Sequence, residues 1–295
     1  MLTFSIIIPT YNRPERLKTC LDSLTRLNYP CDRFEVIIVD DGSDRPLDIL
    51  VKSYDNEIEL NLIRQANAGP ATARNTGAKV AKGQYLAFTD DDCTPEPNWL
   101  LALENGFLET PNGLLGGKTI NALPNNLYST ASQLLIDYLY NYYNIDSYEA
   151  KFFASNNFAV SRELFNQVGQ FDITFPLAAG EDREFCHRWL YQDNKMIYIP
   201  EVTIYHAHKL TLKTFCLQHF NYGRGAFCFH QTRITGTNEP IKVEPLKFYL
   251  NLLNYPFMQQ STQPGMLITI LFLISQIANV VGFFWEQWHQ SAKRF

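Results

Sequence analysis

The chain has 295 residues, of which 46% are hydrophobic and 19% charged, a composition typical of a globular protein with a sizeable core. The formal net charge of −5 argues against a nucleic-acid partner, because proteins that bind nucleic acid usually present a basic face. Six scattered cysteines without a CxxC pair favour reduced thiols in a cytoplasmic protein over a disulfide framework.

The first half of the chain alternates short apolar runs with helical patterns. The opening MLTFSIIIPT has no basic leader and no cleavage site, so we expect a strand there and no signal peptide. The predicted strands are 4–10, 34–43, 58–65 and 84–92. Between them we expect helices over 13–27 and 47–54, and over 69–83 a loop that leads into an Ala-rich helix. This order predicts an α/β fold with an open, doubly wound, mostly parallel sheet.

Polar residues follow three of these strands where each one ends. They are Pro9-Thr10, Asp40-Asp41 and Asp90 to Asp92. Ligands of doubly wound sheets bind beyond the carboxyl ends of the strands. We therefore expect the three polar ends to share one binding crevice.

The second half of the chain is less regular. Its predicted elements are a strand over 113–120, a Tyr-rich helix over 128–143, a strand, turn and helix within 152–172, a helix over 181–192 and a strand pair over 195–209 broken at Pro200. Residues 215–229 are aromatic and fit either a helix pair or a membrane-contact patch.

The tail contains an uncharged stretch over 265–285, and about 20 such residues span a bilayer. Ser275, Gln276 and Asn279 interrupt it, and a basic end, Lys293-Arg294, follows it. A single span would place that basic end outside if the N-terminal part is cytoplasmic, against the positive-inside tendency. An amphipathic helix in the membrane plane, or a helix packed on a partner, avoids the conflict, and a buried core helix is the structural alternative.

The triple aspartate in AFTDDDCTPEP brings like charges together at the end of a predicted strand. On a strand, Asp90 and Asp92 would point the same way while Asp91 faces elsewhere. Such a D-x-D pair suits Mg²⁺ or Mn²⁺ held against a diphosphate, whereas the neighbouring Cys93 thiol is a poor ligand for a hard cation. A solvated turn is the alternative interpretation.

Several stretches together resemble the family 2 glycosyltransferases. They are SIIIPTYNRPERL, VIIVDDGS, NAGPATARNTGAKVAKGQYLAFTDDDCTPEPNWL, NNFAVSRELFNQVGQFD and GEDREFCHRW, in the order and spacing of that family. The resemblance covers most of residues 4–210 and implies a GT-A fold and an inverting enzyme. It does not specify a substrate.

The resemblance also implies a nucleotide site. Pro9 and Thr10 would line it, and Asp41 would contact the base, often uracil, with Asp40 as its neighbour. Arg74 would lie near the nucleotide. Without the flanking motifs, residues 40–43 would read as a helix-capping turn and Arg74 as part of an ordinary helix start.

The remaining implied roles concern the metal and the proton. Asp92 would bind the metal directly, Asp90 would lie nearer the ribose, and His206 would be a further metal ligand. Asp182 would be the general base, and repulsion from Glu181 would raise its pKa. Inverting transfer needs these groups, because a base must deprotonate the attacking hydroxyl while the leaving diphosphate is neutralised. An N-capped helix with surface acids is the alternative interpretation of 180–189.

The sequence thus predicts a metal-dependent inverting glycosyltransferase that uses Mg²⁺ or Mn²⁺, a nucleoside diphosphate sugar (a UDP-sugar favoured) and a glycan or lipid-linked acceptor. We expect a GT-A domain over 1–240, with a nucleotide-sugar half (1–120) and an acceptor half (121–240). Residues 241–295 would associate with the cytoplasmic face of a membrane as a peripheral or monotopic segment.

Three other functions fit parts of the sequence. YLAFTDDDCT matches the D-x-D-x-T signature of haloacid-dehalogenase-type phosphotransferases, with Asp90 as nucleophile beside Asp92 and Thr94, although that motif usually follows the first strand. A nucleotidyltransferase would also bind nucleotide and metal, but usually opens with a Gly-rich loop. A non-catalytic sugar-nucleotide binder would lack an acid, and none is missing.

Overall fold

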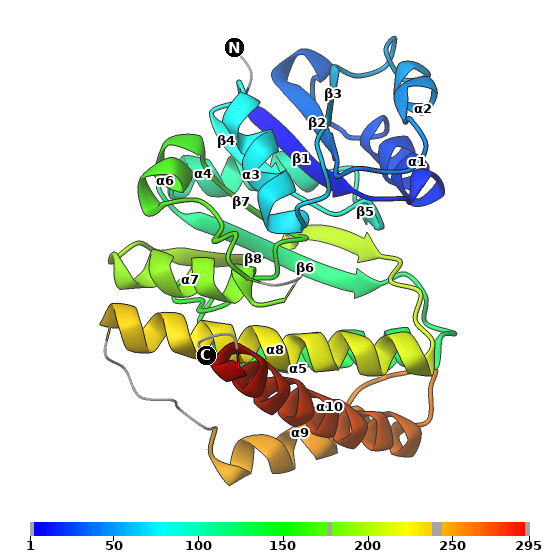
Figure 1. Ribbon diagram of the computed structural model, residues 1–295. Coiled ribbons are helices and arrows are strands. Elements are labelled where there is room, and N and C mark those ends of the chain that lie inside the picture. Colours follow the sequence, from blue (N-terminus) through cyan, green and yellow to red (C-terminus); the bar gives the residue numbers. More distant parts are fainter. Residues whose placement is uncertain (1–2, 176–178, 238–243, 293–295) are drawn as a thin grey trace. The chain divides into compact units, whose positions relative to one another are not determined.

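The computed structural model describes residues 3–175, 179–237 and 244–292 (Figure 1). The chain forms two compact units. The first, here the sheet unit, comprises Met1–Ile120, Tyr143–Ile173 and Asp182–Ala207. The second, here the helical unit, comprises Asn121–Tyr142, Thr174–Glu181 and His208–Phe295.

The sheet unit is built on one mixed sheet in the order β3-β2-β1-β4-β7-β6-β8-β5. Its strands are β1 (Phe4–Thr10), β2 (Phe34–Asp40), β3 (Leu60–Arg64), β4 (Tyr85–Phe88), β5 (Cys93–Pro95), β6 (Leu114–Asn121), β7 (Phe158–Ser161) and β8 (Met196–His206). Strands β1 to β4 pair in parallel, and β7 joins β4 antiparallel. The predicted α/β fold is confirmed.

Helices and a short 3₁₀ turn connect these strands. They are α1 (Pro14–Leu24), η1 (Cys31–Arg33), α2 (Asp48–Lys52), α3 (Pro70–Val80), α4 (Trp99–Glu109), α6 (Arg162–Val168) and α7 (Glu181–Tyr191). Helix α1 shows why they form where they do: Pro14 occupies its first turn, and Leu17, Leu21 and Leu24 recur at helical spacing and are buried.

The core of this unit follows from the apolar runs of its strands. Every residue of β2 is buried, and β1 is buried except at the half-exposed Pro9. A strand in the middle of a parallel sheet is covered on both faces, so it needs a continuous apolar run.

Two strand predictions are wrong. The strand expected over 84–92 ends at Phe88, because the amide of Cys93 donates to the carbonyl of Asp90 and turns the chain into β5. The strand pair expected over 195–209 is the single strand β8, and it runs through Pro200. Pro200 is exposed and lies outside the β5–β8 register, where a proline's missing N–H is tolerated.

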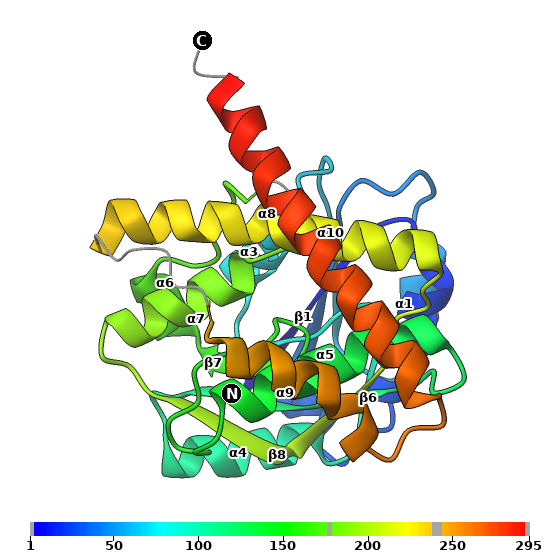
Figure 2. The same cartoon turned by 90° about the horizontal axis from the view of Figure 1, so that it is seen from below.

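The helical unit contains α5 (Leu127–Tyr143), α8 (Leu212–Thr237), α9 (Leu246–Met258) and α10 (Gly265–Ala292). Residues 215–229 therefore belong to one long helix, α8, rather than to a helix pair. Figures 1 and 2 show α10 lying against α8 and α9. Among the described residues, one helix, α10, is long and apolar enough to cross a membrane.

Candidate functional site

The polar ends of β1, β2 and β4 meet at one edge of the sheet, as expected. The register pairs Thr10 with Asp40, and the amide of Asp41 donates to the Thr10 carbonyl at 2.9 Å. The Thr10 hydroxyl donates to Asp91 Oδ2 at 2.7 Å, which ties the end of β1 to the aspartate turn. Pro9 lies beside this edge, paired in register with Val39.

Asp91 is the inward-facing member of the triple aspartate. It is only 2% exposed, and Arg13 Nη1 lies 3.3 Å from its Oδ1. Burial raises the pKa of Asp91 to about 6, although the charge of Arg13 opposes the rise. Its contacts therefore make Asp91 a part of the scaffold that fixes the turn.

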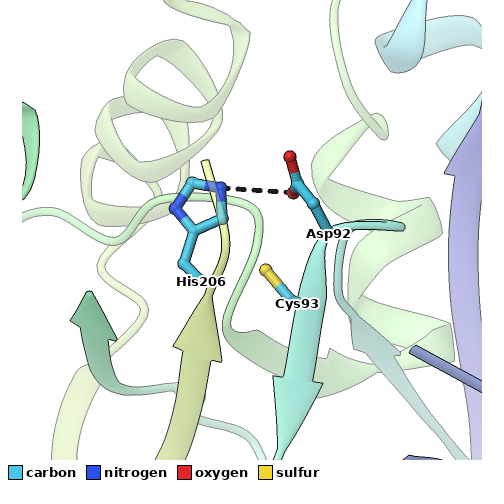
Figure 3. A group of neighbouring side chains, drawn as sticks. All are labelled: Asp92, Cys93 and His206. Carbon is cyan, nitrogen blue, oxygen red and sulfur yellow. Dashed lines mark ion pairs between the residues drawn. The ribbon is translucent and has the colours of Figure 1, made fainter. Parts of the chain in front are cut away.

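Asp92 lies between an arginine and a histidine. Its Oδ1 lies 3.2 Å from His206 Nε2, and its Oδ2 lies 2.8 Å from Arg16 Nη1. The antiparallel register of β5 and β8 pairs Cys93 with His206, which brings the histidine to the aspartate turn (Figure 3). The amide of Ala207 also donates to the Asp92 carbonyl, at 2.8 Å.

The donors of Asp92, Cys93 and His206 lie within 4.8 Å of one another. A carboxylate oxygen and an imidazole nitrogen suit Mn²⁺, and either Mg²⁺ or Mn²⁺ needs only one or two protein carboxylates beside substrate phosphates. Burial raises the pKa of the Cys93 thiol well above its usual value, so the thiol stays protonated and ligates poorly. Asp92 and His206 therefore fit a divalent cation.

The protonation of His206 is set by the same neighbours. Burial lowers its pKa, but the hydrogen bond and charge of Asp92 outweigh burial and leave the pKa raised. An imidazole must be neutral to bind a metal, so metal binding here would release a proton at low pH.

Asp90 is the most exposed of the three aspartates and is paired with Arg74. Arg74 is buried, and its Nη2 donates to Asp90 Oδ1 at 2.7 Å. The Arg74 guanidinium also lies 5.7 Å from the ring centroid of Phe171. Asp90 and Asp92 sit on a turn, so the strand argument for their common direction does not hold.

Asp41 holds the loop that leads into α3. Its Oδ1 accepts from Gln65 Nε2 at 2.7 Å and from the Ala68 amide at 3.0 Å, and its Oδ2 accepts from the Gly69 amide at 2.8 Å. Gly69 has φ = +88°, a conformation that favours glycine. The adjacent Asp40 accepts from the Ser43 amide at 2.8 Å, which is a local turn rather than a helix cap.

Asp182 lies in the first turn of α7 and is half-buried. Its Oδ1 accepts from the Arg183 amide at 2.7 Å, and the Ser155 backbone also donates to it. Burial is the main cause that raises the pKa of Asp182, while the charge of Arg74 lowers it. The expected cause, repulsion by Glu181, is not the main one.

Sequence reasoning missed Arg13 and Arg16, the two arginines that face the aspartate turn. They follow β1 in the NRPER segment, three residues apart, so the first turn of α1 presents both to one side. Two arginines three residues apart beside a strand end were the available signal.

Comparison with known proteins places these features in a family. The model of glycosyl transferase family 2 matches residues 5–169. The chain is 37% identical over 125 residues to Glycosyltransferase AglE of Haloferax volcanii, covering 41% of this chain and 40% of that protein. It is 26% identical over 237 residues to the hyaluronan synthase of Pasteurella multocida, covering 68% of this chain and 24% of that protein. The matched stretches thus cover less than half of the length of each of these relatives.

Two solved structures share the fold. The mannosyltransferase from Pyrobaculum calidifontis, in complex with GDP-Man and Mn²⁺, has a TM-score of 0.68 at 18% identity, covering 96% of this chain and 87% of that one. Residues 1–349 of S. aureus TarS give a TM-score of 0.55 at 19% identity, covering 99% and 92%. At these identities the likeness concerns the fold alone.

Proposed function

The chain belongs to glycosyl transferase family 2 and is a glycosyltransferase with the GT-A fold, and we propose that it transfers a sugar with inversion from a nucleoside diphosphate sugar to a hydroxyl acceptor. The observation that carries the proposal is the Asp92–His206 pair at the edge where the polar strand ends meet. We favour a UDP-sugar donor, because Asp41 matches the base-contacting aspartate of the family. Structural neighbours were solved with UDP-GlcNAc and with GDP-Man, so the donor is a matter for experiment.

Asp92 and His206 would hold the divalent cation, with Asp90 close by. When bound, the cation would neutralise charge on the departing diphosphate. Arg74 would serve the donor side, because its buried guanidinium already holds Asp90 in place. Pro9 and Thr10 would form the wall of the nucleotide site at the end of β1.

Asp182 would take the proton of the acceptor hydroxyl as that oxygen attacks the sugar carbon from the face opposite the leaving group. A raised pKa suits this task, since a base with a pKa closer to the working pH accepts a proton more readily. The Ser155 and Arg183 amides would keep the carboxylate oriented without neutralising it.

The acceptor would be a growing glycan or a glycolipid at the cytoplasmic face of a membrane. Relatives named as hyaluronan, chondroitin and poly(ribitol-phosphate) enzymes support a glycan acceptor. The apolar helix α10 supports a membrane surface. In this arrangement residues 1–240 would be catalytic and 241–295 would associate with the membrane.

A donor panel tests the proposal. Release of nucleoside diphosphate from UDP-, GDP- and dTDP-sugars would be measured with Mn²⁺, Mg²⁺ or EDTA. We expect release from one donor, abolished by EDTA and by Asp92→Asn but unchanged in Asp55→Asn, which makes the same chemical change at an exposed site. Metal-independent release, or full activity in Asp92→Asn, would contradict the proposed metal site.

Family membership favours glycosyl transfer over the phosphotransferase and nucleotidyltransferase hypotheses. A non-catalytic binder predicts a different result from the same panel. Such a protein would show a nucleotide-induced rise in melting temperature together with no turnover of any donor, even with a glycan acceptor present.

A further inference from the structure

Helix α10 has one buried face and one exposed apolar face. Its buried residues are Ile268, Leu271, Phe272, Ser275, Gly282 and Glu286. Eight of its exposed apolar residues share one side and form what we call the apolar stripe: Met266, Ile270, Leu273, Ile277, Val280, Val281, Phe284 and Trp288. Each of these is between 45% and 69% exposed.

The apolar stripe is straight and long. Its residues recur every three or four positions, so they share one side of the helix. From Met266 to Trp288 the stripe extends about 33 Å at the α-helical rise. Helix α9 adds exposed apolar residues to the same unit: Leu246, Leu250, Phe257 and Met258. Monomeric soluble proteins rarely leave so large an apolar patch uncovered.

The opposite face of α10 is held tightly by α8, the yellow helix that crosses it in Figure 2. A Cβ atom on Gly223 would lie 1.9 Å from the Asn279 carbonyl oxygen, and one on Gly282 would lie 1.9 Å from that of Phe220. The two helix backbones therefore approach as closely as glycine permits. Helix α10 therefore cannot separate from α8 without losing these backbone contacts.

Helix α8 is unsuited to hydrocarbon. It carries Lys213, Arg224 and Arg233 along its length. Moving these charges into a bilayer costs several kcal/mol, so α8 would not follow α10 across a membrane. A helix fixed to α8 along its middle is therefore able to lie on a bilayer but not to span it.

The charges around the apolar stripe suit a lipid surface. No Asp, Glu, Lys or Arg occurs from 248 to 285. Glu286 is turned away: it is 3% exposed, and its Oε2 lies 2.7 Å from Arg224 Nε. Lys247 is exposed at the start of α9, and Lys293 and Arg294 follow α10 in the sequence. Tryptophan at a helix end and an exposed lysine are typical of the headgroup region.

We propose that the apolar stripe of α10, together with the exposed face of α9, docks in the plane of a bilayer surface that contains anionic lipids, without crossing the bilayer. The inference deepens the membrane association of the proposed function and rests on it, but it is independent of the donor and of the catalytic residues. It selects the in-plane helix from the alternatives that the sequence leaves open for residues 265–285.

Vesicle binding tests the surface. The full chain would be sedimented with vesicles of phosphatidylcholine alone and of phosphatidylcholine with one quarter phosphatidylglycerol. We expect binding to the mixed vesicles, weakened roughly tenfold or more in Ile277→Glu/Phe284→Glu, since each change withdraws a large apolar side chain from the interface. The matched control is Ile49→Glu/Leu108→Glu, two residues 89% and 77% exposed on the sheet unit.

Each other outcome is informative. Equal binding of both double variants, or none by the unaltered chain, would overturn the proposal. A lower oligomer mass of Ile277→Glu/Phe284→Glu in lipid-free buffer would identify a second copy as the occupant instead. Donor hydrolysis should be unchanged in that variant, so failed lipid binding and failed catalysis are distinguishable.

Depth measurements separate docking from spanning. Trp285 and Trp288 would be changed to phenylalanine, which leaves the fully buried Trp99 and Trp189 as a constant background. Single tryptophans at Met266, Ile277 and Phe284 would then be quenched by lipids brominated at shallow or deep acyl positions. In-plane docking predicts the same shallow profile at all three sites. Deep quenching at Ile277 with shallow quenching at Met266 would show a span and overturn the proposal.

Discussion

The crossing of α8 and α10 gives a sharp prediction about one methyl group, Gly282→Ala. The new Cβ would lie 1.9 Å from the Phe220 carbonyl oxygen and 2.8 Å from its carbon, and backbone atoms cannot rotate aside. Since such contacts are essentially never shorter than 3.0 Å, the helices must separate by about 1 Å. Overpacking of this kind costs about 1–3 kcal/mol, whereas Gly→Ala in a helix gains up to about 1 kcal/mol. We expect a net loss of about 1–2 kcal/mol.

Urea unfolding followed by circular dichroism would measure the loss. Gly265→Ala is the control in the same helix, because its Cβ would meet the exposed ring of Phe257, which is free to move, and would lie at an ordinary 3.5 Å from the Pro256 carbonyl oxygen. Gly223→Ala should cost as much as Gly282→Ala, and the double variant less than their sum, since one separation of the helices accommodates both methyl groups. Stabilisation of Gly282→Ala, as at an exposed helical glycine, would refute the close crossing.

Three further predictions concern buried polar groups. Burial lowers the pKa of His219 to about 4 from 6.5, so the unfolded chain takes up a proton first and stability falls as the pH drops through that interval. Between pH 7 and pH 5, the free energy of unfolding should fall by about 2 kcal/mol less in His219→Phe than in the unaltered chain, as measured by urea unfolding. The same dependence of the unfolding free energy on pH in both proteins would contradict this prediction. Arg16→Ala should lower the melting temperature in EDTA and enlarge the rise in melting temperature caused by Mn²⁺, because Asp92 loses the guanidinium that lies 2.8 Å from it. An equal rise in both proteins would show that Arg16 does not compensate the charge of Asp92. Asp41→Ala should cost about 3 kcal/mol and weaken donor binding, because three donors lose their acceptor; unchanged urea midpoint and donor affinity would argue against it.

The sequence predicts those parts of the fold that local pattern determines. Continuous apolar runs identified β1 and β2, and leucines at helical spacing identified α1. The end of β4 was missed because Thr89 to Asp92 look like a continuation of the strand. What stops the strand is a turn, and the Thr10–Asp91 bond that fixes it joins residues far apart in the chain.

The candidate site likewise depends on contacts between distant parts of the chain, which a local pattern does not predict. His206 was expected from a family resemblance, whereas its approach to Asp92 comes from the β5–β8 register, which no local pattern specifies. Arg13 and Arg16 were missed because a charged helix start usually faces solvent. In α10 the composition predicted an apolar helix, but only the close contact with α8 decides which side is exposed.

The role of Asp182 is tested most directly by comparing Asp182→Asn with the unaltered chain in two assays, donor affinity in the presence of Mn²⁺ and release of nucleoside diphosphate. The exchange keeps the shape of the side chain but removes its capacity to accept a proton. We expect donor affinity within about twofold of the unaltered chain and turnover reduced at least about a hundredfold, because the general base is lost. Retained turnover would contradict the role of Asp182 as the base and with it the proposed mechanism.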